Sequence, residues 1–296
     1  MGYDISKLNA FTQESAKPFA LKSVLEAQTI KVLLDAGSFD PEAKGNTYIN
    51  LMDTDVIIQS AEGCGFNAQG GAVLSQAVLS VVPMKINQEY CESDLVKTFR
   101  VGQLQKGLEY NELSLATEIA ESNSGQVSEK LEELIWKGDV TATGATNHLS
   151  KMDGFLKKIK AGDYIEPDLT GATTMVEKLQ AIFKAVPAKV SSKPDFRIFV
   201  GQGTWDAYSM ELSKLNLFKP VTDQTLFGTS VKIEITNGIE GHVVATRLRS
   251  LQAGGEMSAV EMDVWYSRDQ DVLKLKSLFS LGVTPVYVEE IAYTTI

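Results

Sequence analysis

The sequence is poor in the residues that build redox, metal and nucleophilic sites. It has only two cysteines, Cys64 and Cys91, and two histidines, His148 and His242, in 296 residues. The cysteines show neither CxxC spacing nor the number found in disulfide-rich secreted domains, so we expect reduced thiols. Two histidines exclude a multi-histidine metal centre, and neither lies in a zinc-ligand or nucleophile-elbow motif. We therefore expect no catalytic residue, no metal site and no bound cofactor.

Positive charge is also scarce. The 28 Lys and Arg residues are outnumbered by 38 Asp and Glu residues, which gives a formal net charge of −10. Diffuse attraction to nucleic acid or to an anionic membrane is therefore opposed, and any nucleic-acid contact would be local. The first 23 residues lack the basic segment, apolar core and small-residue cleavage site of a secretory signal. With 44% hydrophobic and 22% charged residues, the chain has the composition of a folded globular protein.

The longest stretch without charge lies between Gly63 and Met84. Polar residues interrupt it, so the apolar length falls short of the roughly 20 residues that a membrane helix needs. Residues 47–89 are rich in β-forming types and predict two long strands joined by a glycine-rich tip. Two interpretations stay open: either this hairpin lies in the protein's own core, or it projects and a neighbouring subunit covers it. The second has a physical basis, because an isolated two-stranded ribbon is marginally stable in water.

The clearest helical pattern covers residues 111–137, where apolar residues recur along one side and glutamates along the other. Residues 123–125, Asn-Ser-Gly, could interrupt this helix, and Gly138 is suited to end it. An earlier helix is expected over residues 19–35, and a short one is expected to start near Asp94.

The following half of the chain alternates helices with strands. We expect helices over 174–186 and 203–215, and a short buried strand over 196–200. Two strands should flank the turn at 237–238, and further strands should follow from Glu261 onward.

One segment looks like a dinucleotide-binding turn. Gly201-x-Gly203 follows the strand over 196–200 and precedes a helix, as that fingerprint requires. The fingerprint needs Gly or Ala where this chain has Asp206, whose carboxylate would repel a pyrophosphate at the start of the helix. We therefore favour a structural strand–turn–helix and keep a dinucleotide-binding enzyme as the lesser alternative.

The order of these features resembles the major capsid proteins of tailed bacteriophages, which have the Hong Kong 97-like fold. The matching features are an N-terminal arm, the uncharged hairpin, an acidic helix ending in EELIWKGD, the linker MDGFLKKI, the segment FRIFVGQGTWDAY, and a strand run beginning VWYSRDQD. The resemblance extends over nearly the whole chain. Its most telling local match is residues 133–139 followed by 153–155.

The resemblance implies an α+β fold with an N-terminal arm, an extended loop that lies across a neighbour, a peripheral domain with a long spine helix, and an axial domain. It assigns these parts to residues 1–46, to 47–90, to 91–169 with 251–296 (spine helix about 111–137), and to 170–250. It places the assembly interface in the extended loop, at Glu62, Gly63, Gly65, Phe66, Gly70, Gly71, Val73 and Leu74. At the end of the spine helix it singles out Trp136, Gly138 and Asp139.

The implied function is that of a major capsid protein, not an enzyme, which self-assembles into an icosahedral head around double-stranded DNA. The implied partners are hexamers and pentamers of the same chain, a portal, a possible decoration protein, and DNA bound without sequence specificity; no membrane is involved. The arm is too short for a scaffolding segment, so either a separate scaffolding protein acts or this chain lacks the segment. The protein would lie in the virion after assembly in the host bacterial cytoplasm. An encapsulin-type compartment shell is the nearest alternative.

Some family members link subunits by an isopeptide bond between a lysine of the extended loop and an asparagine of a neighbour. Residues 47–84 contain no lysine, and Lys44 and Lys85 stand only at the base of the hairpin. The sequence therefore predicts a shell held together without covalent links.

Overall fold

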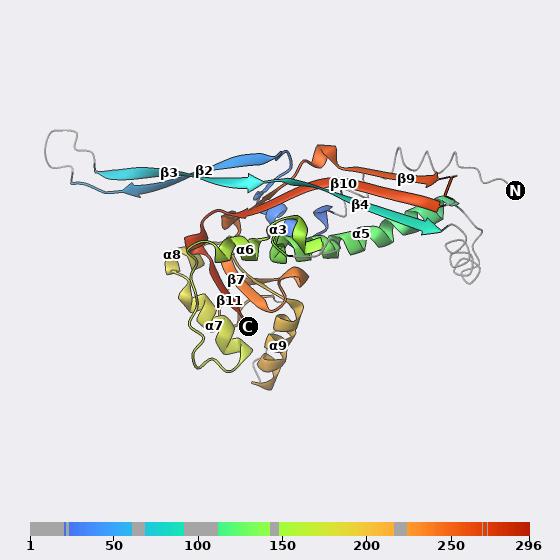
Figure 1. The fold of residues 1–296 in the computed structure, drawn as a ribbon. Helices are drawn as coiled ribbons and strands as arrows, with labels where there is room; N and C mark the ends of the chain where they lie inside the picture. The colour runs from blue at the N-terminus through green and yellow to red at the C-terminus, as the bar shows by residue number, and fades with distance from the viewer. Residues whose placement is uncertain are drawn as a thin grey trace.

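The computed structural model describes residues 21, 24–60, 69–91, 112–142, 148–215, 224–267, 269–270 and 272–296. Figure 1 shows a long sheet lying over a long helix, a second unit of helices and strands below them, and a narrow ribbon that leaves the body at one end. Short 3-10 turns connect several elements, at His148–Lys151 (η1), Asn237–Ile239 (η2), Leu248–Ser250 (η3), Met257–Ala259 (η4) and Val288–Glu290 (η5).

The large sheet is organised around its longest strand, β10 (Val272–Pro285). This strand pairs antiparallel with β4 (Val82–Cys91), β9 (Glu261–Ser267) and β8 (Leu251–Gly254), and β8 continues to a short parallel strand, β1 (Phe39–Asp40). The last four side chains of β10 are all buried, whereas those from Val272 to Leu281 alternate between half-buried and buried. This is the period of two that a strand shows when only one of its faces packs on a core.

The helix under this sheet is α5 (Glu112–Lys137), a single element of 26 residues. The predicted helix over 111–137 is therefore confirmed, and the Asn-Ser-Gly segment does not break it. Asn123 is buried, and its side-chain amide donates to the Tyr90 hydroxyl of β4 at 2.9 Å. This hydrogen bond joins the polar segment of α5 to the sheet.

The second unit is a four-stranded sheet in the order β11 (Ala292–Thr295), β7 (His242–Arg247), β5 (Phe196–Val200) and β6 (Lys232–Ile235). The strands predicted on either side of residues 237–238 are confirmed, but they do not pair with each other. Instead β5 lies between them, parallel to β6 and antiparallel to β7.

Helices cover this smaller sheet and give it a core of its own. The helices α7 (Met175–Ala185) and α9 (Gln202–Lys214) match the predicted ones within two residues at each end, and a short α8 (Ala188–Ser191) follows α7. Thr174 and Glu177 form a capping box that fixes the start of α7. The buried cluster includes Leu179, Ile182 and Tyr208.

The first described helix, α3 (Gln28–Asp35), is shorter than the helix predicted over 19–35. Ala27 has a non-helical ψ of 125° and interrupts the helix before Gln28, so a single continuous helix is wrong. The predicted end is confirmed, because Gly37 follows with a φ of +71°. The helix expected near Asp94 lies outside the described residues.

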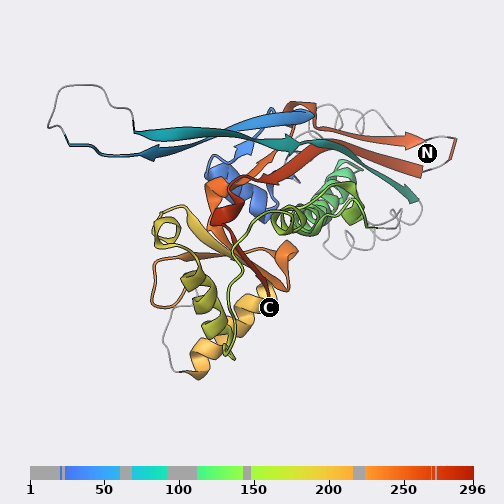
Figure 2. The same ribbon diagram turned by 60° about the vertical axis from the view of Figure 1, so that its left-hand side comes forward.

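The ribbon consists of β2 (Asn46–Val56) and β3 (Gly70–Ser80), paired antiparallel along their whole length. Figures 1 and 2 show that it points away from the rest of the molecule in both views. The expected second strand was too long, because the chain leaves the ribbon after Ser80 and continues as β4 in the large sheet. Pairing with the 14-residue β10, over a buried core, provides more contacts than a longer isolated ribbon would.

Candidate assembly surface

The ribbon has two chemically different faces, because directly opposed residues of an antiparallel pair point to the same side. We call one side the uncharged face. Its members are Tyr48, Asn50, Met52, Thr54 and Val56 of β2, which oppose Val78, Gln76, Leu74, Ala72 and Gly70 of β3.

Large apolar side chains on the uncharged face are open to solvent. Leu74 is 76% exposed, its cross-strand partner Met52 is 61% exposed, and Val56 nearer the tip is 79% exposed. Between the apolar pairs, the Gln76 amide donates to the Asn50 carbonyl oxygen at 2.8 Å. The ribbon therefore does not lie in the core of its own chain, and the first of the two interpretations left open by the sequence is wrong.

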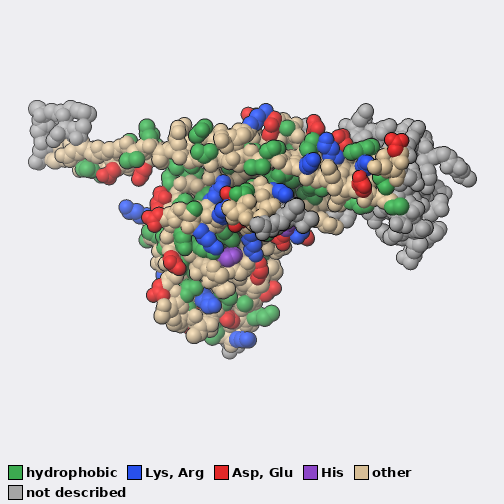
Figure 3. Space-filling view, in the orientation of Figure 1, with side chains coloured by type: hydrophobic (Ala, Val, Ile, Leu, Met, Phe, Trp, Pro, Cys, Tyr) green, Lys and Arg blue, Asp and Glu red, His purple; other side chains and the backbone are tan. Residues whose placement is uncertain are grey.

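The opposite face carries the acidic residues of the described ribbon. Asp53 opposes Val73 and Asp55 opposes Gly71, so Val73 and Leu74, grouped by the sequence prediction, point to different sides. Figure 3 shows hydrophobic and acidic side chains along the ribbon, and the residues of β2 and β3 include no Lys, Arg or His. Only one face is therefore suited to a dry contact.

The glycines at the end of the ribbon differ in what they require. Gly70 has a φ of +92°, and an added Cβ would collide with the Asp55 carbonyl, so this position needs glycine. Gly71 has open space around it. The other predicted interface residues, Glu62, Gly63, Gly65 and Phe66, lie outside the described residues.

Trp136, at the end of α5, is fully buried and lies at a junction of elements. Its ring centroid is 5.3 Å from those of Phe155 of α6 (Phe155–Lys160) and Phe199 of β5, and its indole N–H donates to Thr29 Oγ1 of α3 at 2.7 Å. Glu132, one turn earlier on α5, accepts from the Thr29 backbone N–H at 3.1 Å and from the Thr29 hydroxyl. Trp136 thus links α5 to α3, α6 and β5, and it is not an exposed contact.

Gly138 is required because two backbone segments cross without room for a side chain. A Cβ on Gly138 would lie 2.6 Å from the Leu134 carbonyl oxygen, and one on Gly154 would lie 2.6 Å from the Trp136 carbonyl oxygen. The Gly154 N–H donates to the Gly138 carbonyl at 2.9 Å. The two segments that carry the most telling local resemblance, residues 133–139 and 153–155, therefore pack together as one junction.

Asp139 completes this junction through charge. Lys157 donates to Asp139 at 2.6 Å and to Asp153 at 2.7 Å, so one ammonium joins the segments after α5 and before α6. The hydrogen bond from Lys157, together with those from the Thr141 hydroxyl and backbone N–H, lowers the pKa of Asp139 to about 2. The sequence prediction named Trp136, Gly138 and Asp139 but missed Glu132 and Lys157, whose roles depend on contacts between distant segments.

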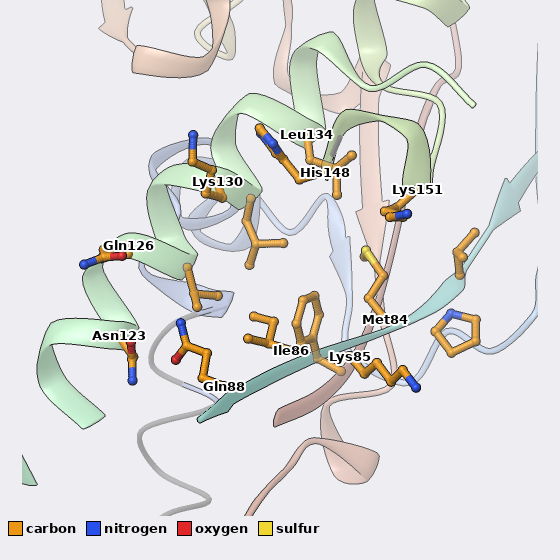
Figure 4. Close-up of a pocket in the computed structure, with 15 residues that line it drawn as sticks. Met84, Lys85, Ile86, Gln88, Asn123, Gln126, Lys130, Leu134, His148 and Lys151 are labelled. Atoms are coloured by element: carbon orange, nitrogen blue, oxygen red, sulfur yellow. The ribbon is translucent and has the colours of Figure 1, made fainter. Parts of the chain in front are cut away.

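A groove of about 630 Å³ opens between β4 and α5, and we call it the helix–sheet groove. Figure 4 shows Met84 and Ile86 extending from β4 toward the helix. No pattern in the sequence predicted this groove. Its lining residues are Val82, Pro83, Met84, Lys85, Ile86, Gln88, Asn123, Gln126, Val127, Lys130, Leu131, Leu134, His148, Lys151 and Phe279.

The glycine turn before α9 is occupied by the protein's own carboxylate. The Gly203 N–H donates to Glu240 Oε2 at 3.3 Å, and a side chain at Gly201 would collide with the same carboxylate. A phosphate at this helix start would therefore meet a negative charge, in addition to Asp206 on the helix. This arrangement argues against the dinucleotide-binding alternative.

Two negative findings hold for the part of the chain that the structure describes. Within it, no helix is both long and apolar enough to cross a membrane. The same residues contain no group of three or more His, Cys, Asp or Glu side chains placed to hold a metal ion.

The layers, the projecting ribbon and the long helix define the class of fold, an α+β capsid fold of the Hong Kong 97-like type, as the resemblance implied. No family model and no curated protein matches the sequence. Solved structures match over most of its length. A structure of Gordonia phage Cozz has a TM-score of 0.60 at 8% identity, covering 89% of this chain and 85% of that chain.

Two more structures agree with this comparison. The procapsid of satellite phage P4 with its size-determination protein gives a TM-score of 0.56 at 10% identity, covering 87% of this chain and 91% of that one. The capsid of Myoviridae phage XM1 gives 0.54 at 14% identity, covering 88% and 90%. At such low identities the similarity establishes the fold.

Proposed function

We propose that this protein is the major capsid protein of a tailed bacteriophage, a structural protein whose copies close into an icosahedral head around double-stranded DNA. The observation that carries the proposal is the exposed uncharged face of the ribbon, which the described residues of the same chain leave uncovered. The fold supports it, since two of the similar structures are a procapsid and a capsid. The protein would assemble in the host bacterial cytoplasm and remain in the virion.

The proposed partners follow from this role. Hexamers and pentamers of the same chain would form through head-to-tail contacts, which give closed rings when the rotation between copies closes. A net charge of −10 is compatible with a shell that encloses DNA without sequence specificity and without binding it tightly. A separate scaffolding protein, a portal and a possible decoration protein complete the expected set.

We assign the parts of the chain accordingly. Residues 1–46 form the arm, residues 47–80 form the extended loop, and residues 170–250 form the axial domain. The segment 82–91, as β4, belongs with the peripheral domain because it pairs with β10. In this assignment the junction around Trp136 fixes the spine helix against the arm and the axial domain, and the ribbon makes the contact between copies.

Expression of the full chain, alone and with its candidate scaffold, tests this function. We expect closed shells in electron micrographs and a fast-sedimenting species that contains only this protein and its scaffold. In particles from infected cells, nuclease-resistant double-stranded DNA is expected inside. A compact soluble monomer under all conditions would contradict the proposal, and an enzyme cargo in place of DNA would favour the encapsulin alternative.

A further inference from the structure

Three basic side chains lie near one another where the ends of α5 and α6 come close to β7 and β11. Lys137 and Lys160 are the last residues of the two helices, and His242 is the first residue of β7. The Lys160 amine lies 5.3 Å from the centre of the Tyr293 ring of β11, and the Tyr293 hydroxyl lies 3.1 Å from Nδ1 of His242. Figure 3 shows Lys and Arg side chains around a histidine in the middle of this face. We call Lys137, Lys160, His242 and the exposed Thr295 the basic cluster.

The basic cluster has no acidic counterpart among the described residues. Burial lowers the pKa of His242, the charges of Lys160 and Lys137 lower it further, and no carboxylate of the described residues opposes them. Asp139, two residues after Lys137, is bonded to Lys157 instead, at 2.6 Å. Neither Lys137 nor Lys160 forms an ion pair with a described residue. In a chain of net charge −10, this is a local concentration of positive charge that the described residues leave uncompensated.

Tyr293 fixes the orientation and the protonation of the His242 ring. It is buried, and its hydroxyl lies within reach of Nδ1 of His242 and, at 3.2 Å, of the Thr295 hydroxyl. A phenol donates to an unprotonated imidazole nitrogen, so the neutral ring carries its proton on Nε2. No described residue accepts a hydrogen bond from Nε2. The basic cluster therefore offers two ammonium groups, a ring N–H and a hydroxyl to a ligand.

We propose that the basic cluster binds a phosphate group of nucleic acid, and that it is the local point at which the enclosed DNA backbone contacts the shell. This inference rests on the proposed capsid function, and it places this face of the protein on the inner side of the shell.

The kind and number of donors favour a phosphate. A phosphate group has several oxygens and can accept from ammonium groups, a ring N–H and a hydroxyl at the same time, whereas a carboxylate has only two oxygens. None of these donors selects a base, so the contact carries no sequence specificity.

The openness of the basic cluster favours a polymer over a small anion. Lys160 and Thr295 are exposed, so a single phosphate stays largely hydrated and is held weakly. DNA presents many phosphates to many copies of the same cluster, and such repeated weak contacts add up. The contact is thus compatible with an acidic shell that does not bind its contents tightly.

Nuclear magnetic resonance of the unassembled full chain tests the site, because the protein has only two histidine rings to assign. A DNA duplex of about 20 base pairs is added, and inorganic phosphate is added in a parallel titration. We expect the duplex to raise the pH midpoint of the His242 titration by at least about 0.5, since a bound phosphate favours the charged ring. The ring of His148, which already lies 2.8 Å from Glu133, should not respond.

Matched pairs of lysine substitutions provide the control. Lys137→Gln with Lys160→Gln should abolish the rise caused by the duplex. Lys184→Gln with Lys189→Gln removes the same charge from exposed positions of α7 and α8 and should preserve it. Four results would overturn the proposal: no rise at all, equal loss in both double variants, a rise with inorganic phosphate but not with the duplex, or an equal rise with a polyglutamate peptide.

Photo-crosslinking in particles from infected cells gives a second test. Benzoylphenylalanine replaces Ala161, which is exposed directly after Lys160, or the exposed Ala188 at the start of α8. We expect at least about fivefold more DNA attached to the chain from position 161 than from position 188, because phosphate contacts fix where the backbone lies. Equal attachment, or none from position 161 in DNA-filled particles, would overturn the site. Particles without DNA would instead count against the capsid function.

Discussion

Glu132 is a carboxylate buried at the point where α3, α5 and η2 meet. It is 3% exposed and accepts hydrogen bonds from Thr29 and, at 3.3 Å, from the Trp136 indole. Burial raises the pKa of Glu132, although these donors act in the opposite direction. A raised folded-state pKa stabilises the protein fully below the unfolded value of 4.5, and that contribution is lost as the pH rises through the folded pKa.

Glu132→Gln tests this linkage, because glutamine keeps the shape of the side chain and does not titrate. We expect the free energy of unfolding to fall by roughly 1–3 kcal/mol, since the added NH₂ group faces the Thr29 and Trp136 donors. The loss should be larger at pH 4 than at pH 7, because only the wild type has the Glu132 contribution, which decreases as the pH rises over that interval. Urea unfolding at both pH values measures it, and a loss that grows with pH would contradict the direction of the shift.

Gly125, within α5, and Gly138, directly after its end, provide a matched comparison. Gly138→Ala places a methyl group against the Leu134 and Met152 carbonyls, whereas nothing lies within 4 Å of a methyl group on Gly125. We expect Gly138→Ala to cost about 1–3 kcal/mol through overpacking and Gly125→Ala to gain up to ~1 kcal/mol through helix propensity. Thermal unfolding of the two variants measures both changes in stability. Equal effects would show that the junction can relax.

At the scale of elements, the ribbon is the part that one chain does not need in order to fold. Its described strands pair with each other, and only residues near the base, such as Leu79, are buried in the body. Replacing residues 50–76 by Asn-Gly joins Ile49 to Ala77, which are directly opposed, through a type I′ turn. We expect the unfolding free energy to change by less than about 1 kcal/mol, while shell assembly is abolished.

Calorimetry and electron microscopy of this shortened chain provide the measurement, and a variant that keeps all residues but has Gly71→Ala serves as the control, because a side chain fits there. Shells formed without the ribbon would remove it from the assembly contact. Loss of folding in the monomer would show that the ribbon stabilises the body.

Elements with strong local patterns were predictable from the sequence. The helix α5 and the strand β5 appear within one residue of their predicted bounds, because periodicity and buried β-branched or aromatic residues specify them locally. The break between β3 and β4 was missed, since both segments have the same β-type composition and only pairing with β10, some 190 residues later, separates them. The same limit hid the groove and Lys157, which depend on distant segments meeting.

At the scale of the whole molecule, the absence of lysine from the described ribbon predicts that copies in the proposed shell associate without covalent links. Lys44, at the base, forms an ion pair with Glu256 at 2.5 Å, and Lys85 belongs to the groove lining. Neither amine stands on the part of the ribbon that would lie over a neighbour. Contacts between copies then depend on buried apolar area, of which ~800 Å² per partner is the usual size for a stable interface.

The shell should therefore dissociate completely in denaturant. We expect purified shells boiled in sodium dodecyl sulfate to run as one band at the mass of a single chain, because no bond between copies survives unfolding. Shells treated first with an amine-reactive crosslinker are the positive control and should show multiples of that mass. A series of such multiples in untreated shells would contradict a noncovalent shell. A single band would support the view that the repeated ribbon contacts, although each is weak alone, hold the closed shell together.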